Sequence, residues 1–512
     1  MRTKIPAEVF DIYEELSRAG FEAYLVGGSV RDSLLSREPK DWDITTNARP
    51  PQIQVIFKDS VYENQFGTVG VKTESKNERL KIVEITTFRL EGKYSDKRHP
   101  DEIKFADTVE EDLARRDFTV NAIALGLTPD EKPTTDNGFV FCETELIDPF
   151  SGEKDLEARI IRTVGNPDER FSEDALRLTR AVRLAIELDF KIETRTREAI
   201  KKNAGLIRAI ARERIRDEFI KILMAPEAQK GMELLEEFGL LQYIAPELRE
   251  GIGISQNKHH KYTVWEHGLY SLGFAASENY SLAVRLAALF HDIAKPRTKT
   301  GEGPDSHFYG HDGLSAKITK ALLERLCFPR EEIEKVVTLV RLHMFKADPE
   351  EITESAVRRT IRSAGPENIW ELINLRTADR IGSGVPKAWP YRLRSYMALV
   401  EKNLREPVSL KQMVLKGDRL MELLGLSPGP RVGWILYILF EEILDEPAKN
   451  NLPYLEEKAR DLNLLNEEEL KSLAEKSKAA YQQILSEEEE EIRKKYYVGQ
   501  GNGEQSATSN KK

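Results

Sequence analysis

The chain has 512 residues, of which 32% are charged and 40% are apolar, and its formal net charge is −10. Its length predicts about two to four domains, and no apolar run approaches the roughly 20 residues that a membrane-spanning helix needs. The N-terminus lacks the apolar core of a signal peptide, and Cys142 and Cys327 lie too far apart in sequence to indicate a disulfide framework. We therefore expect a globular cytoplasmic protein. The acidic net charge counts only slightly against nucleic-acid binding, because residues 195–221 carry a local excess of Lys and Arg.

The first 150 residues are expected to form a mixed α/β head. Tyr24 to Val26 predict a short apolar strand, Gly27 and Gly28 a turn, and the residues that follow a helix. From about residue 155 the apolar residues recur with a helical period, which predicts a helical remainder and an α+β fold class. Alternating patterns predict three further strands, at 41–46, 67–74 and 79–89.

Two aspartates follow the glycine turn closely. Asp41 and Asp43 lie on a predicted strand, where an i, i+2 spacing puts both carboxylates on one face. A divalent metal would relieve their repulsion, and Mg²⁺ prefers carboxylate oxygens together with substrate phosphates. The Gly27-Gly28 turn can offer backbone N–H groups to a triphosphate at a helix N-terminus, with Arg31 as a nearby cation. Each motif alone is more often an ordinary turn or strand edge, but their order along the chain indicates phosphoryl transfer.

These motifs resemble a known family. LVGGSVRDSLLSREPKDWDITTNARP is similar to the head motif of class II tRNA nucleotidyltransferases and bacterial poly(A) polymerases. The resemblance implies a polymerase-β-like head in which Asp41 and Asp43 hold two catalytic Mg²⁺ ions. It also implies that Glu84 is a third catalytic carboxylate, and an outward-facing strand glutamate is the alternative. The similarity continues through EEDLARRDFTVNAIAL, IDPFSGEKDLEARIIRTVG and RFSEDALRLTRAVRLAIELDF.

A second group of charged residues recurs every three positions, at Asp174, Arg177, Arg180 and Arg183. On a helix these positions drift slowly around one side, and a solvated basic face is the alternative reading. Cytosine and adenine both present an amino donor beside a ring-nitrogen acceptor, which an Asp acceptor next to an Arg donor matches. Uracil and guanine would leave buried polar groups unpaired there, at roughly 1–3 kcal/mol each. Such a pair can accept C and A and reject U and G without a nucleic-acid template.

The resemblance assigns nucleotide-binding roles to these residues and to two that precede them. Asp174 and Arg177 would read the base, whereas phosphate or ribose would be met by Arg180, Arg183 and Arg116. Asp117 would support Arg116 or contact the ribose. Residues 87–105 resemble the flexible loop of family members that switch from adding C to adding A, which argues against a CC-only enzyme.

Six of the eight histidines lie between residues 259 and 311. A signature similar to that of the HD phosphohydrolase superfamily is formed by His267, His291, Asp292 and Asp379. His311 and His343 are candidate ligands of a second ion. Imidazole with carboxylate suits Mn²⁺, Ni²⁺, Fe²⁺ or Mg²⁺ better than a structural zinc site, which usually recruits thiolate. The resemblance implies hydrolysis of 2′,3′-cyclic or 2′-phosphate groups, and an HD fold that has lost hydrolysis is the alternative.

The predicted function is template-independent addition of C and A to the 3′ end of tRNA from CTP and ATP, with release of pyrophosphate. An A-adding enzyme and a poly(A) polymerase are alternatives with the same chemistry. An HD phosphohydrolase with a nucleotide-sensing head is the alternative from another class, and the intact aspartates count against it. The expected segments are a catalytic head over 1–150, a helical neck with base- and RNA-binding elements over 151–250, an HD domain over 251–400, a tRNA-binding helical module over 401–465, and a charged helix with a disordered tail over 466–512.

Overall fold

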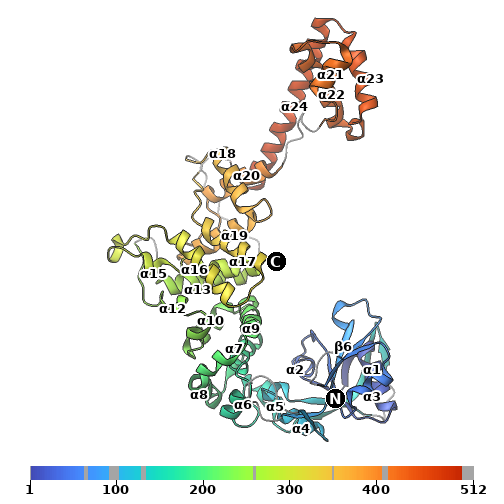
Figure 1. Ribbon diagram of the computed structural model, residues 1–512, viewed down its shortest axis with the longest axis vertical. Coiled ribbons are helices and arrows are strands. Elements are labelled where there is room, and N and C mark those ends of the chain that lie inside the picture. Colours follow the sequence, from blue (N-terminus) through green and yellow to red (C-terminus); the bar gives the residue numbers. More distant parts are fainter. Residues whose placement is uncertain are drawn as a thin grey trace. The chain divides into compact units, whose positions relative to one another are not determined.

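The computed structural model describes residues 2–62, 67–91, 103–128, 134–257, 261–348, 351–405 and 413–498 (Figure 1). These residues form two compact units, the first within 1–341 and 378–385 and the second within 342–377 and 386–512. Most of the expected switching loop, 87–105, and all of the expected disordered tail lie outside the described residues. Within the described part, no helix is both long and apolar enough to cross a membrane.

The first unit begins with a mixed sheet, which confirms the predicted α+β fold class. Its main strands follow the order β1-β11-β9-β2-β3-β6-β5-β4, with β10 paired to β11. The β3–β6 pair is parallel, and the other neighbours are antiparallel. The strands are β1 (Arg2–Pro6), β2 (Ala23–Val26), β3 (Asp43–Thr46), β4 (Ser60–Tyr62), β5 (Thr68–Lys72), β6 (Ile82–Thr87), β9 (Ala124–Leu127), β10 (Thr134–Asp136) and β11 (Phe139–Ile147).

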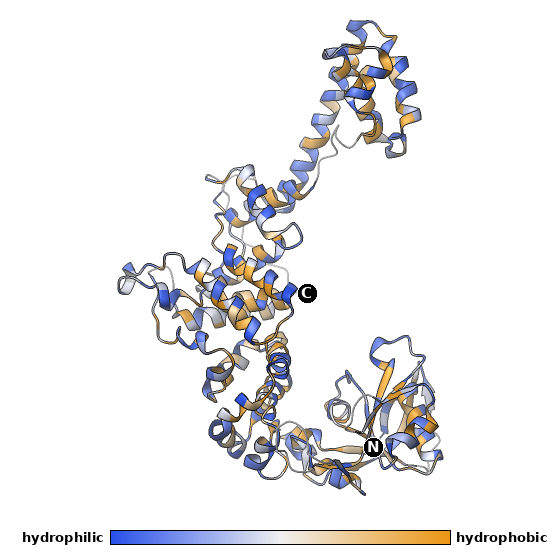
Figure 2. Ribbon diagram, viewed as in Figure 1, coloured by the Kyte–Doolittle hydropathy of each residue, from blue (hydrophilic) through white to orange (hydrophobic). Residues whose placement is uncertain are grey.

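Alternation of side chains gives this sheet its faces. In β6, Val83 and Ile85 are buried, whereas Ile82 and Glu84 are exposed. Figure 2 shows apolar residues gathered on the strands of the head. Helix α1 (Ala7–Arg18) packs against β1, β2 and β11. Its buried stripe has helical spacing and consists of Val9, Ile12, Tyr13 and Leu16.

Short helices connect the strands of the head and lead into the neck. The head helices are α2 (Gly28–Leu34), α3 (Pro50–Ile56) and α4 (Val109–Ala114), and a separate hairpin is formed by β7 (Arg89–Glu91) and β8 (Ile103–Phe105). The neck contains α5 (Gly152–Glu157), α6 (Pro167–Glu173), α7 (Arg177–Leu188), α8 (Thr194–Asn203), α9 (Arg212–Met224), α10 (Ala228–Glu237), α11 (Leu241–Ile244) and α12 (Pro246–Arg249), with a short parallel pair, β12 (Ile160–Ile161) and β13 (Lys191–Ile192).

Helices α7, α9 and α10 pack together as the core of the neck. A Cβ atom on Gly231 of α10 would lie 2.7 Å from Ile222 and 2.8 Å from Ile186, so this close approach requires glycine. The continuous helix expected from Asp174 onward is wrong at its start. Helix α6 ends at Glu173, and Asp174 is extended with φ −135° and ψ 104°. The reason is local, because the Asp174 carboxylate accepts a hydrogen bond from the Leu176 N–H, as aspartates at helix starts commonly do.

The first unit continues with the helices α13 (Val264–Ser277), α14 (Leu282–Phe290), α15 (Lys295–Thr298), α16 (His311–Arg325) and α17 (Arg330–Leu342). Arg285 of α14 is almost fully buried and joins this part to the neck. Its guanidinium donates hydrogen bonds to the carbonyl oxygens of Leu223 and Ala225 at the end of α9. It also donates to the carbonyl of Ala276 in α13, so it satisfies the ends of two helices.

The second unit is helical. It contains α18 (Glu354–Ala364), α20 (Tyr391–Leu404), α21 (Gly417–Leu424), α22 (Pro430–Asp445), α23 (Leu452–Asn463) and α24 (Glu467–Lys495), and α19 (Ile369–Gly382) runs from it into the first unit. Leu470 and Ala474 of α24 share one apolar core with Leu420, Ile435 and Leu455. The charged helix expected after residue 465 therefore packs on the helices that precede it.

Candidate active site

A cavity of about 720 Å³ lies in the first unit, with the head on one side and the neck on the other. Of the twelve head and neck residues predicted for catalysis and nucleotide binding, eleven line it, and Glu84 does not. These eleven are Gly27, Gly28, Arg31, Asp41, Asp43, Arg116, Asp117, Asp174, Arg177, Arg180 and Arg183. Residues that are more than 150 positions apart in the sequence thus meet around one space.

The glycine turn and the two aspartates meet at the head side of the cavity. Asp43 begins β3 beside Val26 of β2, and Asp41 precedes the strand instead of lying on it. A Cβ atom on Gly27, whose φ is +77°, would lie 3.4 Å from Asp43 Oδ2 and 3.1 Å from Arg116 Nη1. Glycine therefore lets the chain turn and leaves space beside the carboxylate.

Asp43 sits among charges that oppose one another. Burial raises the pKa of the Asp43 carboxyl, the Arg116 guanidinium opposes that rise, and the Asp41 carboxylate adds to it. A divalent cation bound between Asp41 and Asp43 would stabilise both ionised carboxylates, so this donor set fits the expected magnesium.

Glu84 lies on the neighbouring strand. Asp43 and Glu84 are Cα partners in the parallel β3–β6 pair, so both side chains leave the same face of the sheet. Glu84 is exposed. The strand register therefore places Glu84 beside Asp43, but outside the cavity lining.

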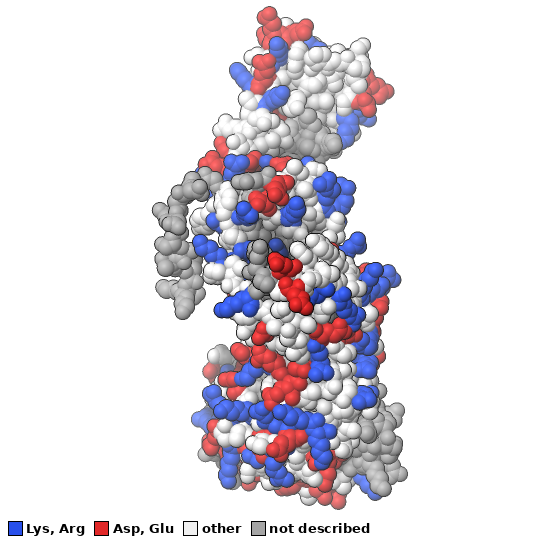
Figure 3. Space-filling model, turned by 90° about the vertical axis from the view of Figure 1, so that its left-hand side faces the viewer, with Lys and Arg blue, Asp and Glu red and all other residues white. Residues whose placement is uncertain are grey.

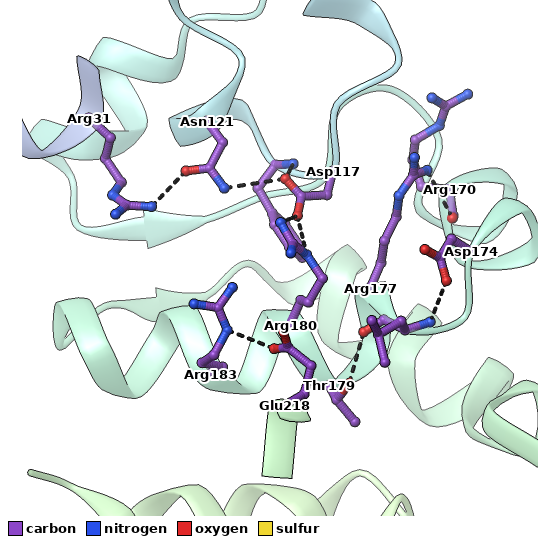
Figure 4. Close-up of polar contacts among 12 residues, drawn as sticks. Arg31, Asp117, Asn121, Arg170, Asp174, Arg177, Thr179, Arg180, Arg183 and Glu218 are labelled. Carbon is purple, nitrogen blue, oxygen red and sulfur yellow. Dashed lines mark hydrogen bonds and ion pairs between the residues drawn. The ribbon is translucent and has the colours of Figure 1, made fainter. Parts of the chain in front are cut away.

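A hydrogen-bonded chain crosses the cavity from head to neck (Figure 4). Arg31 Nη1 donates to Asn121 Oδ1 at 2.8 Å, and Asn121 Nδ2 donates to Asp117 Oδ1 at 3.3 Å. Arg180 of α7 donates to Asp117 Oδ2 through Nε at 2.7 Å. Although burial opposes ionisation, Arg180 and Arg177 lower the pKa of Asp117 to about 2. Asp117 therefore stays ionised and links the head to the neck.

Two residues that support the site, Asn121 and Asp112, were not predicted from the sequence. Asn121 joins Arg31 to Asp117, and its signal was only its position four residues after Asp117 in a single turn. Asp112 is fully buried on α4, where it pairs with Arg115 at 2.7 Å and Arg116 at 3.3 Å. The spacings i, i+3 and i, i+4 on one helix were the signal for these pairs.

The predicted base-reading residues are held by different partners. Asp174 accepts from Arg214 Nη2 of α9 at 2.8 Å and from the Leu176 N–H at 2.9 Å. Arg177 is buried and donates to Glu173 Oε2 at 2.6 Å and to the Arg115 carbonyl at 2.9 Å. Both residues line the cavity, but Arg177 also ties α7 to α6 and to the head.

Arg183 lies one turn beyond Arg180 and is held by two carboxylates. Its Nε donates to Glu218 Oε2 at 2.7 Å, and its Nη1 donates to Glu187 Oε2 at 2.9 Å. The pKa of Arg180 is raised, mainly by the Asp117 carboxylate and also by Glu218, which is buried on α9. Helix α9 thus supports the cavity wall formed by α7.

Many charges of the basic stretch 195–221 have partners within the protein. Arg197 and Lys201 pair with Glu237, and Lys202 pairs with Asp168. Accordingly, the face drawn in Figure 3 shows Lys and Arg interleaved with Asp and Glu. The local charge excess alone therefore does not define an RNA-binding surface.

The histidine signature forms a second, separate cluster in the first unit. His267, His291 and Asp292 are buried, and their candidate ligand atoms lie within 4.8 Å of one another. Asp379 Oδ1 lies 3.3 Å from His267 Nε2, and His311 Nε2 lies 3.2 Å from Asp292 Oδ1. The structure thus brings together five of the six expected ligands. His343 belongs to the second unit, and its partnership with His311 stays a prediction.

The surroundings of this cluster fit a divalent metal. His291 Nδ1 lies 2.9 Å from the Ala288 carbonyl and His311 Nδ1 lies 2.7 Å from the Phe308 carbonyl, which leaves each Nε2 facing the cluster. Although burial disfavours charge, Asp292 and Asp379 raise the pKa of His291 to about 10. Lys295 Nζ also lies 2.7 Å from Asp292 Oδ2. Metal binding would therefore release a proton from this cluster.

Three protein families match successive parts of the chain. The Poly A polymerase head domain matches residues 23–162. The family described as the probable RNA and SrmB-binding site of polymerase A matches residues 189–252. The HD domain matches residues 264–381. The head, neck and histidine cluster therefore each have a family counterpart.

Curated relatives extend this similarity to most of the chain. The A-adding tRNA nucleotidyltransferase of Deinococcus radiodurans is 35% identical over 432 residues, which cover 82% of this chain and 91% of the relative. The CCA-adding enzyme of Streptococcus sanguinis is 33% identical and matches 88% of this chain and 97% of its own length. That of Enterococcus faecalis is 44% identical over a shorter match, 49% of this chain and 58% of the relative.

Solved structures agree with these relatives. A crystal structure of the Bacillus stearothermophilus CCA-adding enzyme in complex with CTP has a TM-score of 0.57 and 27% identity. It covers 89% of this chain and 97% of that enzyme. A tRNA nucleotidyltransferase complexed with a primer tRNA and an incoming ATP analogue shares the fold, with a TM-score of 0.51 at 21% identity.

Proposed function

Since this chain belongs to the family of tRNA nucleotidyltransferases and bacterial poly(A) polymerases, we propose that it adds C and A to the 3′ end of tRNA. CTP and ATP would be the substrates, and pyrophosphate the second product. The observation that carries this proposal is the shared cavity, whose lining brings together Asp41 and Asp43 from the head with Arg177, Arg180 and Arg183 from the neck.

The proposed reaction is an in-line displacement. The tRNA 3′-oxygen forms a bond to the α-phosphorus, and the bond from that phosphorus to pyrophosphate breaks. Mg²⁺ bound to Asp41 and Asp43 would supply charge neutralisation at the triphosphate. The Gly27-Gly28 turn and Arg31 would bind phosphate oxygens at the N-terminus of α2. The protein contributes mainly position and charge, because this chemistry needs no covalent enzyme intermediate.

The neck residues would select and hold the nucleotide. Asp174 and Arg177 would read the amino and ring-nitrogen groups that cytosine and adenine share. Asp117 and Arg180 form one ion pair at the head–neck junction, where ribose or phosphate could contact both. Arg116 Nη1 and Asp43 Oδ2 both lie beside Gly27, so Arg116 would meet phosphate near the metal ligands. Glu84, beside Asp43 in the sheet, would be the third carboxylate.

The decisive experiment is incorporation on defined ends. The purified chain would be incubated with tRNA lacking CCA, tRNA ending in C, tRNA ending in CC and an unstructured oligoribonucleotide, each with CTP, ATP or both. We expect completion of CCA on all three tRNAs. Addition of A to the CC end alone would instead identify an A-adding enzyme, the activity named for the Deinococcus radiodurans relative. Long A-tracts on the unstructured RNA would identify a poly(A) polymerase.

A second activity is proposed for the histidine cluster. Its buried imidazole and carboxylate set supports binding of a divalent transition metal such as Mn²⁺ or Ni²⁺. We propose that it hydrolyses 2′,3′-cyclic or 2′-phosphate groups on RNA ends. Metal analysis of the purified protein and a cyclic-phosphate assay test this proposal directly. The five segments expected from the sequence remain our proposed functional subdivision, with tRNA contacts in the neck and in the module over 401–465.

A further inference from the structure

Asp174 depends on other residues for its orientation. It lies in the extended break between α6 and α7, so no helix fixes the direction of its side chain. Two donors hold its carboxylate instead, the Leu176 N–H on Oδ1 at 2.9 Å and Arg214 Nη2 on Oδ2 at 2.8 Å. Arg214 Nη1 also lies 3.5 Å from Oδ1. A carboxylate has about four lone-pair positions, two on each oxygen, so these three donors leave one position, on Oδ2, for another donor.

Arg214 itself belongs to the cavity. Arg214 belongs to α9 and lines the same cavity as Asp174. One turn further along α9, Glu218 holds Arg183 at 2.7 Å. One face of α9 therefore supports both ends of the row of nucleotide-binding residues. Arg214 pairs with Asp174 at one end, and Glu218 pairs with Arg183 at the other.

We propose that Arg214 is a positioning residue for base selection, which deepens the proposed function and rests on it. Arg214 and the Leu176 N–H fix the plane of the Asp174 carboxylate, so that the remaining lone pair on Oδ2 meets the exocyclic amino group shared by cytosine and adenine. Without Arg214 the carboxylate can rotate. Uracil, which has a carbonyl oxygen where cytosine has its amino group, is then no longer opposed by a fixed acceptor. Base discrimination then falls, whereas the triphosphate-binding residues on the head keep their geometry.

The test compares Arg214→Met and Arg214→Lys with the wild-type chain. Steady-state kcat and KM would be measured for CTP, ATP, UTP and GTP, with inhibition by inorganic pyrophosphate as a readout of the triphosphate site. For Arg214→Met we expect the ratio of kcat/KM for CTP over UTP to fall roughly tenfold, since one directed hydrogen bond loses its geometry. Arg214→Lys keeps the charge without the planar fork, so we expect roughly a threefold fall. Pyrophosphate inhibition should not change in either variant.

The matched control is Arg325→Met. Arg325 pairs with Glu247 at 2.6 Å, and these side chains are 35% and 16% exposed, against 30% and 17% for Arg214 and Asp174. Breaking this pair costs similar stability away from the cavity, and base discrimination should stay at the wild-type value. Equal loss of activity for all four nucleotides in the Arg214 variants, or unchanged discrimination, would overturn the proposal. If Arg214→Met does not fold, the same two outcomes in Arg214→Lys decide it. A wild-type chain that adds neither C nor A to any tRNA would refute the proposed function instead.

Discussion

Asp43 and Glu84 are direct partners in the parallel register of β3 and β6, so their carboxylates leave the same face of the head sheet. The chain between them forms α3, β4 and β5, and returns beside its starting point. Neighbouring strands lie about 4.8 Å apart, a separation that a shared metal site can bridge. The two residues lie side by side, but only Asp43 lines the cavity. Mutation of each residue can therefore separate their roles.

Asp43→Ala and Asp41→Ala should each abolish nucleotide addition, by roughly 10³-fold or more, because a metal-binding carboxylate supplies several kcal/mol of transition-state stabilisation. Glu84→Gln should have a smaller effect if its role is to assist Asp43. Incorporation of labelled CTP and ATP would measure both effects, and tRNA binding should persist in all three variants. Glu145→Gln is the matched control, since Glu145 is an exposed strand glutamate on β11. Near-wild-type incorporation by Asp43→Ala would remove the metal assignment.

Asp174 and Arg177 should both affect base discrimination, and their effects on stability should distinguish them. Asp174→Ala should reduce discrimination against UTP and GTP by about tenfold with little change in pyrophosphate inhibition. Arg177→Ala should lose discrimination as well, and also stability, because Arg177 is buried between Glu173 and the Arg115 carbonyl. Steady-state kinetics with all four nucleotides and thermal unfolding would distinguish these outcomes. An equal fall for all four nucleotides in the Asp174 variant would mean that this residue holds the site together without reading bases.

The ion pair between Asp117 and Arg180 predicts a pH-dependent stability. The folded-state pKa of Asp117 is about 2, below the ordinary value of 3.8, so its ionised form stabilises the fold above pH 3.8. Asp117→Asn should therefore lower the free energy of unfolding by about 2 kcal/mol at pH 7, and this difference should shrink as the pH falls from 4 toward 2. Urea unfolding across that range measures the effect. Asp136→Asn is the surface control, because Asp136 is exposed on β10, and a difference for Asp117→Asn that does not vary with pH would contradict the assignment.

The sequence predicted the head closely because its signals are local. The strand at 24–26, the glycine turn and the alternating strand at 79–89 each depend on a few neighbouring residues, and the structure has β2, a Gly27 with φ +77° and β6 at these places. The prediction of which residues would meet in one cavity came from family resemblance. Spacing alone could not have joined Asp43 to Arg180 across more than 130 positions.

The departures at Asp174 and α9 have different physical causes, one local and one long-range. A carboxylate can end a helix by accepting its own backbone N–H groups, which an i, i+3 pattern does not reveal, and Asp174 does so. Arg214 and Glu218 lie in a stretch whose charge excess favoured an RNA surface, yet both bind residues of the cavity wall. Long-range ion pairs of this kind depend on how helices pack, which no local pattern encodes.

The last prediction concerns the independence of the histidine cluster. Its ligands lie on α13, α16 and α19 and in the turn that follows α14, and none of them lines the nucleotide cavity. His291→Ala combined with Asp292→Ala should therefore leave addition of C and A within about twofold of wild type, because changes at sites without shared partners act nearly independently.

The same variant should lose bound transition metal, measured by elemental analysis, and any hydrolysis of 2′,3′-cyclic phosphates. Stability is expected to fall, since Lys295 loses its carboxylate partner Asp292 at 2.7 Å and keeps the uncharged Gln256, so Asp379→Asn serves as a milder second variant. A tRNA end that carries a 2′,3′-cyclic phosphate has no free 3′-hydroxyl. Hydrolysis that breaks the bond between phosphorus and the 3′-oxygen, and leaves the phosphate on the 2′-oxygen, would restore the 3′-hydroxyl that the nucleotide cavity needs. Loss of nucleotide addition in both stably folded variants would show that the two sites are coupled, and a wild-type chain with neither metal nor hydrolysis would leave this domain a scaffold.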